Sequence, residues 1–477
     1  MNPQKTIDVA ILAHEQVCLL VQGVFLNALW MFLVLGWIVA ARKNPKGAFG
    51  GGLPSKGHLG LAIAVWAGSF GIALAEFDPS TWFLAFAIAN GAMLSMLNPA
   101  FALSFALSMM LMRPWEMMRA NAVILEIPRF SMSFSIAWSL LYFVTIDRFT
   151  LRLNRTVLIL LAFAAWMFAS TTVIPDAGPA RLLFSEMMVR AVIIFLLIHH
   201  LVRDSFSMWS LRTTLTTILT GIGMLSIMLY FEGYRETGRL LAFGIFKNTN
   251  DIAAVMVLLF CLGLAPWVAK GRGSIERLIS FIPIGTSLLS IALSQSRGAL
   301  VSIGAVGAVH AFTKIQRKGL AVLAIIVIVG SGYVATSAFK RDAGDLEASS
   351  ESRKSFWISG INMAVYNPIF GVGFTRFPHN FERYASKIVG EYGKRTAHSS
   401  WILALAEGGW IGFFLFSAFY GIGAIWHGIK LIPDDPTWLY GAVGYGTAIS
   451  FLSHTYLLFP YMFVAAVTAA FTLREKP

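Results

Sequence analysis

Long apolar segments constrain this chain more than any other feature. Residues 157–174, 252–268 and 320–333 contain no charged side chain. A helix needs about 20 mainly apolar residues to cross roughly 30 Å of hydrocarbon. None of these segments alternates between polar and apolar residues, as the strands of a membrane barrel do. They therefore predict membrane-spanning helices and an all-α fold.

Composition supports the same class. Hydrophobic residues make up 57% of the 477 residues and charged residues only 13%, which is too apolar for the surface of a soluble domain. The first apolar segment, residues 18–41, is too long for the core of a cleavable signal and is expected to remain as a helix. Both cysteines, Cys18 and Cys261, lie within apolar segments, so we expect neither a disulfide framework nor a cysteine metal site.

The net charge of +13 has an ordinary explanation in a membrane protein. Cytoplasmic loops are rich in lysine and arginine, and basic residues beside the membrane bind anionic membrane lipid. Nucleic-acid binding requires a soluble basic module, and the sequence contains none. We therefore expect membrane lipid as a partner and no nucleic acid.

Basic clusters and apolar segments alternate in the C-terminal half, and this alternation predicts the topology. The clusters assigned to the cytoplasm are residues 270–277, 314–318, 427–430 and 474–476. The predicted spans are residues 252–268, 279–293, 299–313, 319–338, 400–426, 437–455 and 457–473. In the N-terminal half, Asn98-Pro99 interrupts residues 81–111, which predicts two short or bent helices there.

The predicted fold is therefore a polytopic transmembrane helical bundle of about 12–15 helices with one large external loop, residues 339–398. We divide the chain into N-terminal transmembrane helices, residues 1–231, and a C-terminal region, residues 232–473, which includes that loop.

The external loop is too long to be only a connection, and it is unusually basic for its side of the membrane. Its cationic residues include Arg376, Arg383 and Arg395. This excess indicates an anionic ligand. The alternative is a solvated loop whose acidic residues, such as Glu382 and Glu391, offset much of the charge.

Arg297 stands between two apolar segments with no polar loop around it. Such an arginine is costly near hydrocarbon unless it meets water or an anion. A guanidinium can bind two phosphate oxygens at once, and the neighbouring Gly298 permits close backbone approach. The sequence thus predicts a phosphate ligand for Arg297, and the alternative is that its side chain extends to the lipid headgroups.

Another basic cluster precedes the span that begins at residue 252. It contains Arg235, Arg239 and Lys247, together with Asn250. Asn250 or Thr249 can cap the following helix, whose free N–H groups would then face an anion. Capping is the simpler explanation of Asn250, whereas the three cations favour an anionic substrate.

His398 and Glu407 lie where the external loop returns to the membrane. The imidazole of His398 could accept a proton, donate to a phosphate or merely cap a helix with Ser399. Glu407 falls inside an apolar segment, where a carboxylate is either a functional residue or a structural partner for a neighbouring helix. The adjacent Gly408-Gly409 pair would allow that neighbour to pack closely.

Several nucleotide and metal motifs are absent from the sequence. It has no Walker A loop, no dinucleotide-binding glycine fingerprint after a strand, no His-Glu-x-x-His and no Asp-x-Asp pair. A magnesium-dependent reaction with a soluble nucleotide sugar is therefore disfavoured, and we expect no metal and no cofactor. In the predicted topology the three clusters, around Arg239, Arg297 and His398, all lie at the external face.

Together these clusters resemble the O-antigen ligase and O-antigen polymerase superfamily of bacterial membrane glycosyltransferases. The resemblance covers residues 239–416. It is carried by Arg239, Gly244 and Asn250, by Ser296-Arg-Gly298, by Tyr366-Asn-Pro-Ile-Phe-Gly-Val-Gly-Phe374, and by Ala397-His398 with Glu407-Gly-Gly409. Many relatives have asparagine after the histidine, where this chain has Ser399.

The resemblance implies a metal-independent helical enzyme of the GT-C type in the bacterial inner membrane, with its active site on the periplasmic face. Its donor would be a glycan on undecaprenyl pyrophosphate, and its acceptor either lipid A core or a growing polysaccharide. Arg297 and Arg239 would hold the pyrophosphate, and His398 would lie beside the reacting centre. A single displacement would invert the anomeric carbon.

Two other classes of protein stay open from the sequence. A transporter of a small anion could also use arginine and glutamate within the membrane, and some candidate transporters share the C-terminal pattern. A long aromatic external loop favours the enzyme. A non-catalytic assembly subunit gives no reason for three basic clusters at one face.

Overall fold

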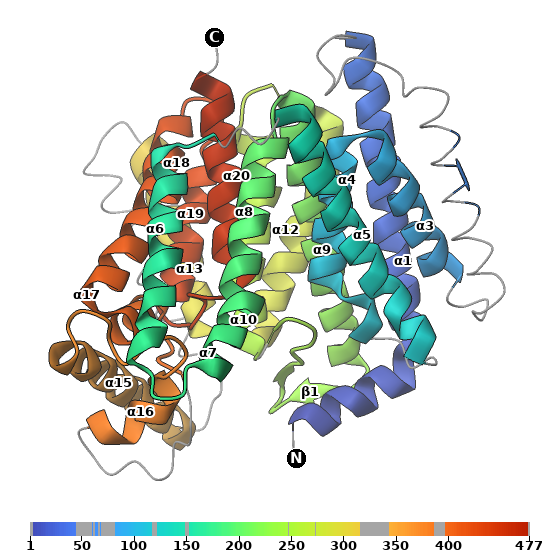
Figure 1. Ribbon diagram of the computed structural model, residues 1–477. Helices are drawn as coiled ribbons and strands as arrows, with labels where there is room; N and C mark the ends of the chain where they lie inside the picture. The colour runs from blue at the N-terminus through green and yellow to red at the C-terminus, as the bar shows by residue number, and fades with distance from the viewer. Residues whose placement is uncertain are drawn as a thin grey trace. The chain divides into compact units, whose positions relative to one another are not determined.

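The computed structural model confirms the predicted all-α membrane fold and describes most of the chain (Figure 1). The described residues are 3–43, 60, 63–64, 67, 82–116, 122–147, 152–246, 248–271, 273–314, 343–385 and 396–475. Within them, strand is confined to a two-stranded antiparallel hairpin, β1 (Arg235–Glu236) and β2 (Arg239–Leu240). The chain forms two compact units, which are described separately.

Unit 1 comprises residues 1–151, 197–296 and 472–477. Its helices are α1 (Pro3–Lys43), α3 (Trp82–Leu97), α4 (Pro99–Met112), η1 (Pro114–Glu116), α5 (Ala122–Asp147), α9 (Ser205–Phe231), α10 (Thr249–Gly263), α11 (Ala265–Val268) and α12 (Ser274–Ser294). α9 lies at the centre of this unit and packs against α1, α4, α10 and α12. Close packing depends on small residues: a methyl group added at Gly223 of α9 would collide with Thr286 of α12.

The predicted break at Asn98-Pro99 is confirmed. α3 ends at Leu97 and α4 begins at Pro99. The side chain of Asn98 caps α4 by accepting a hydrogen bond of 2.8 Å from the backbone N–H of Ala100. Proline lacks the N–H that a continuous helix would need, and at the first helical position that loss costs nothing.

Unit 2 comprises residues 152–196 and 297–471. Its helices are α6 (Arg155–Ala169), η2 (Ser170–Val173), α7 (Gly178–Phe184), η3 (Ser185–Val189), α8 (Arg190–Leu201, which continues into unit 1), α13 (Arg297–Lys314), α15 (Ala343–Tyr366), α16 (Phe377–Tyr384), α17 (Ser400–Tyr420), η4 (Gly421–Trp426), α18 (His427–Leu431), α19 (Thr437–Ile449) and α20 (Leu458–Glu475). α17 packs against α6 and α15, while α13 packs against α19. The rings of Phe419 on α17 and Tyr461 on α20 stack 5.4 Å apart.

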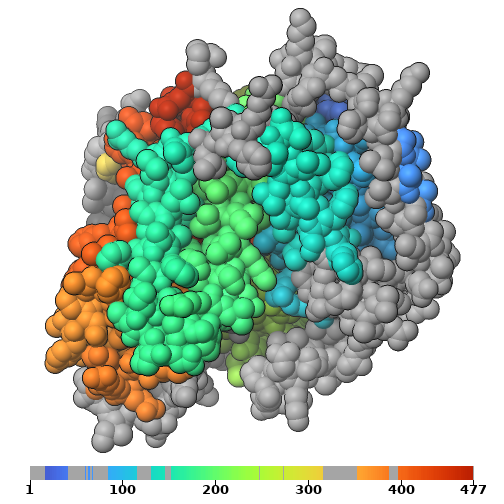
Figure 2. All heavy atoms as spheres, in the orientation of Figure 1, coloured from blue at the N-terminus to red at the C-terminus, as the bar shows by residue number. Residues whose placement is uncertain are grey.

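Seven helical segments of the described chain are long and apolar enough to cross a membrane. They are Val17–Ala40, Arg155–Val173, Gly178–Leu201, Ser205–Phe231, Thr249–Val268, Ser274–Ser294 and Ser400–Leu431. Large apolar side chains lie on their outer surfaces, including Leu158 and Phe168 of α6, and Figure 2 shows α6 at the surface of the molecule. Such side chains suit contact with lipid.

The predicted spans 252–268, 279–293, 299–313 and 400–426 are confirmed as helices. Helices also occupy most of 437–455 and 457–473, whereas the predicted span 319–338 lies outside the described residues. The predicted external loop is partly helical, because residues 339–398 contain α15 and α16.

Candidate functional site

The site in unit 2 is built on a break in α17. The backbone leaves helical geometry at Gly409, which has φ +66° and ψ −167°. Glycine adopts this conformation without the steric cost that a side chain would add. The break frees backbone groups on both sides of it from the helix, and they bond to residues 368–372 instead.

Residues 368–372 form the turn between α15 and α16 and are bonded directly to the break. The N–H of Val372 donates to the carbonyl of Ala406 over 2.8 Å, and the N–H of Trp410 donates to the carbonyl of Pro368 over 2.9 Å. A methyl group at Gly371 or at Gly409 would collide with the facing carbonyl oxygen. The two motifs around Tyr366–Phe374 and Glu407–Gly409, which carried the family resemblance, therefore interlock. The predicted close packing at Gly408-Gly409 is confirmed.

α6 closes the other side of the break. The indole N–H of Trp166 donates to the carbonyl of Gly408 over 2.8 Å, and its ring stacks on Phe370 at 4.7 Å. Because one side chain contacts both motifs, it holds their relative position.

The carboxylate of Glu407 fixes the segment that leads into α16. It is 1% exposed, and its oxygens accept hydrogen bonds from the backbone N–H of Thr375 over 2.9 Å and of Phe377 over 2.8 Å. Thr375 has φ +61°, a strained conformation for a residue with a branched side chain. Charge-assisted bonds on either side of Arg376 stabilise that backbone. The structure thus favours the structural alternative for Glu407, and its direct contact with substrate stays a prediction.

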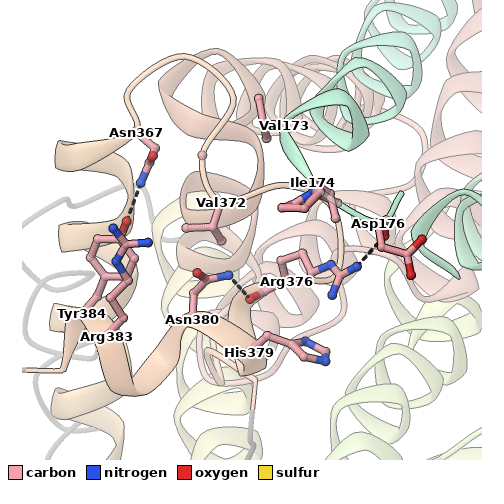
Figure 3. A pocket seen from close by; sticks show the side chains of 12 residues that line it. Val173, Ile174, Asp176, Asn367, Val372, Arg376, His379, Asn380, Arg383 and Tyr384 are labelled. Carbon is pink, nitrogen blue, oxygen red and sulfur yellow. Dashed lines mark hydrogen bonds between the residues drawn. The ribbon is translucent and has the colours of Figure 1, made fainter. Parts of the chain in front are cut away.

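A cavity of about 470 Å³ opens beside α16 (Figure 3). Two of the predicted substrate-binding residues, Arg376 and Arg383, line it. One guanidinium nitrogen of Arg376 donates to the backbone carbonyl of Asp176 over 2.8 Å, which joins α16 to the connection between α6 and α7. The cavity is also lined by Val173, Ile174, Pro175, Asp176, Asn367, Gly371, Val372, His379, Asn380 and Tyr384.

His398 lies directly before α17, which begins with Ser399 as its cap. Its backbone has φ +49°, and its imidazole lies 5.5 Å from the ring of the buried Phe356 on α15. Two residues further on, the hydroxyl of Ser400 donates to the carbonyl of Leu452 over 2.7 Å and accepts from the N–H of His454. These bonds tie the start of α17 to the connection between α19 and α20.

Arg297 is the first residue of α13, and it is half-buried. Its Nε atom is buried and has no hydrogen-bond partner among the described residues. A buried, unpaired guanidinium nitrogen is costly, so an anion supplied by a ligand would stabilise it. The neighbouring Gly298 approaches Phe451, and Trp401 donates to Ser450 over 2.9 Å. Arg297 and the start of α17 therefore both lie against the connection between α19 and α20.

The predicted residues of the Arg239 cluster belong to unit 1, so their convergence with Arg297 and His398 stays a prediction. Arg235 and Arg239 lie on the two strands of the hairpin, and Arg239 is opposite Glu236. Arg235 donates through Nε to the carbonyl of Tyr230 over 3.1 Å, with its guanidinium 4.3 Å from the centre of the Tyr230 ring.

A polar side chain caps α10, but the predicted capping residue was wrong. Asn248, rather than Asn250 or Thr249, caps the helix and bonds reciprocally with Asp251. Asn250 is the second helical residue, and its backbone N–H donates to the side chain of Asn248 over 2.9 Å. The hydroxyl of Thr249 can donate its hydrogen to either of two acceptors within reach, a carboxylate oxygen of Glu236 at 3.0 Å and the carbonyl of Leu240 at 2.7 Å.

Lys247 and Arg395, two further predicted substrate-binding residues, lie outside the described residues. Sequence reasoning missed five polar residues of the cavity: Asp176, Asn367, His379, Asn380 and Tyr384. Asn367 stood within the motif Tyr366-Asn-Pro and could have been found there. Asp176 had no local signal, because it follows α6, far from α16 in sequence. Groups of residues able to hold a metal ion are absent from the described chain.

Fold and site define a polytopic helical membrane protein in which a broken helix holds a basic polar cavity. Residues 282–417 match the family model described as O-Antigen ligase. This segment extends from α12 to α17 and includes Arg297, His398 and Glu407. No curated protein matches the chain. This match over residues 282–417 confirms the predicted resemblance to the O-antigen ligase and O-antigen polymerase superfamily.

Proposed function

We propose that this protein is a metal-independent, inverting membrane glycosyltransferase that moves a glycan from undecaprenyl pyrophosphate to a sugar hydroxyl of an acceptor. The observation that carries the proposal is the O-antigen ligase match over residues 282–417, which spans both Arg297 and His398. The buried Nε of Arg297, without a partner among the described residues, supports an anionic ligand at the same end of α13.

In this reaction the acceptor oxygen attacks the anomeric carbon, the bond from that carbon to the pyrophosphate oxygen breaks, and the hydroxyl proton leaves. Negative charge grows on the departing pyrophosphate. Arg297 and Arg239 are proposed to stabilise that charge, whereas Arg235, Lys247 and Asn250 are predicted to bind substrate. Because pyrophosphate is already a good leaving group, positioning of the reactants supplies much of the rate enhancement.

His398 has two possible roles, which make different predictions. As a general base it removes the hydroxyl proton, so His398→Ala should abolish turnover with donor binding nearly intact, and acid should slow the wild-type enzyme by protonating the imidazole. If His398 instead binds the diphosphate, the His398→Ala protein should bind the donor more weakly. Protonation of the imidazole by acid should then not slow the reaction.

Transfer by the purified full-length protein tests the function. The donor is an undecaprenyl-pyrophosphate glycan, and the acceptors, in separate reactions, are lipid A core and a second lipid-linked glycan. Transfer to lipid A core identifies a ligase, and transfer to the second glycan identifies a polymerase. Absence of transfer to both acceptors, with a protein preparation that still binds the donor, contradicts the proposal.

The predicted location is the bacterial inner membrane, with the site on the periplasmic face. Cysteines introduced at Ser349 and Ser386 should react with an impermeant thiol reagent in intact spheroplasts. Labelling only after permeabilisation would place the segment on the cytoplasmic side and overturn the site assignment.

A further inference from the structure

We propose that the cavity beside α16 is a saccharide-binding subsite that selects a sugar carrying a carboxylate. This inference rests on the proposed function, because it identifies the part of the glycan that the cavity holds. Its volume of about 470 Å³ falls within the range of roughly 300–1,000 Å³ that is usual for small-molecule sites.

The amide side chains of the cavity suit sugar hydroxyls, which both donate and accept hydrogen bonds. Asn380 uses its amide nitrogen to donate to the carbonyl of Arg376 over 2.9 Å, and Asn367 uses its nitrogen to donate to the hydroxyl of Tyr384, also over 2.9 Å (Figure 3). Among the described residues, the amide oxygen of each is left without a partner. Each oxygen can therefore accept from a ligand hydroxyl.

The charges favour an acidic sugar over a neutral one. Arg376, Arg383 and the imidazole of His379 face the cavity against a single carboxylate, that of Asp176. Arg383 is exposed, and its guanidinium lies 5.6 Å from the centre of the Tyr384 ring. A carboxylate can accept two parallel hydrogen bonds from such a guanidinium, and the ring offers an apolar face to the sugar.

The same lining disfavours the pyrophosphate as the occupant. A diphosphate carries more negative charge than the single carboxylate of an acidic sugar, so Asp176, which lies in the lining beside Arg376, repels it more strongly. It would also leave the two acceptor oxygens of the asparagines without donors, since an ionised diphosphate supplies none. A sugar satisfies donors and acceptors together.

The lining is held in place before any ligand arrives. Glu407 bonds the backbone on both sides of Arg376, and the N–H of Val372 is bonded to the broken helix. Gly371, Gly373 and Thr375 all have positive φ, so this short segment follows a path that ordinary sequence would not adopt. A rigid lining reduces the entropy lost on binding, which a weakly bound sugar requires.

Calorimetric titration of the full-length protein in detergent micelles tests this site. The probes are a disaccharide of galacturonic acid, the neutral galactose disaccharide of the same linkage, and inorganic phosphate. We expect the acidic disaccharide to bind at least about fivefold more tightly than the neutral one, because a charged hydrogen bond contributes more than a neutral one.

Arg383→Gln should weaken binding of the acidic disaccharide about tenfold, as expected for loss of one charge-assisted contact. His379→Gln should weaken it less. Both residues are exposed, so both variants should fold. Arg181→Gln is the matched control: it removes an exposed arginine of α7 that does not line the cavity, and its affinity should equal that of the wild type.

Three results would overturn the inference. They are no binding of the acidic disaccharide at millimolar concentration, equal affinity for the neutral disaccharide, and displacement of the acidic disaccharide by equimolar phosphate. The last result would identify a simple anion site. Transfer activity without disaccharide binding would contradict the subsite and leave the proposed function intact. Disaccharide binding without transfer activity would contradict the proposed function and leave the saccharide site intact.

Discussion

Residues 235–251 in unit 1 and residues 366–384 in unit 2 are both basic segments at predicted external helix ends, but they are stabilised differently. In the first, bonds are local: Arg235 contacts Tyr230, and Asn248 bonds with Asp251. In the second, Glu407 of a distant helix holds the backbone, while Arg383 remains exposed at a cavity. Excess positive charge is therefore a weak indication of a site. The second segment differs from the first in having an exposed cation at a cavity and a backbone that is fixed by a residue distant in sequence.

The largest expected effect comes from adding a methyl group at the break in α17. Gly409→Ala should lower the free energy of unfolding by about 4 kcal/mol or more, because the methyl group meets backbone carbonyls and the residue has positive φ. Gly238→Ala in the hairpin also has positive φ but no atom within 4 Å of the added methyl group, so it should cost only about 1 kcal/mol.

Unfolding by titration with sodium dodecyl sulfate, followed by circular dichroism, measures both variants. Gly421→Ala is the control, since Gly421 is helical and also has no neighbour within 4 Å of the added methyl group. Equal stability of Gly409→Ala and Gly238→Ala would show that the interlock in unit 2 contributes no more than a local turn.

The next effect is on catalysis. Arg297→Lys keeps the charge but loses the paired hydrogen bonds of a guanidinium, so transfer should slow about 100-fold. Steady-state transfer to the active acceptor measures it, and Arg181→Lys should be unaffected. A folded Arg297→Lys protein with the wild-type rate would mean that the arginine only extends to the lipid headgroups. Unit 2 would then differ from unit 1 in how its basic segment is stabilised but not in a catalytic role of Arg297.

Glu407→Gln tests how firmly the distant helix holds the basic segment. The amide can accept through one oxygen only and turns an N–H donor toward a backbone N–H, so we expect a loss of about 2 kcal/mol in stability. Asp251→Asn, which weakens the local cap of α10, should cost about 1 kcal/mol.

The same detergent titration compares these two variants. A loss for Asp251→Asn as large as that for Glu407→Gln would remove the distinction between local and distant support.

Arg235→Gln should have the smallest effect. Its partners, the carbonyl and ring of Tyr230, lie in the last turn of α9, and the hydrogen bond between them and Arg235 is exposed, so stability should change by less than about 0.5 kcal/mol. Transfer should stay within about twofold of the wild type if those contacts account for the residue. A larger loss of transfer, with unchanged stability, would support the predicted role of Arg235 in binding substrate.

Local signals predicted the parts of the fold that depend on local chemistry. The break at Asn98-Pro99 was found because proline and a capping side chain act within a few residues. The cap of α10 was predicted at Asn250 or Thr249, two residues or one after the true cap Asn248, because Asn248 and Asn250 offer the same side chain. The Gly408-Gly409 pair indicated close packing without indicating the partner.

The candidate site was only partly predictable for a related reason. Arg376 and Arg383 were found from their charge, but Asp176 reaches the same cavity from a connection far upstream. Nothing in the sequence around Asp176 reports that proximity, since it depends on how α6 packs on α17. Likewise, the carboxylate of Glu407 could be recognised as buried, but its two backbone partners could not be identified.

The break at Gly409 also affects the order in which the protein can be made. Residues 368–372 leave the ribosome before α17, yet their amides and carbonyls bond to Ala406 and Trp410. The turn therefore cannot reach its final form until α17 has been synthesised and inserted, and closing that chain loop carries an entropic cost. A chain that ends before Ala406 would leave the N–H of Val372 and the carbonyl of Pro368 without the partners that they have in the complete fold.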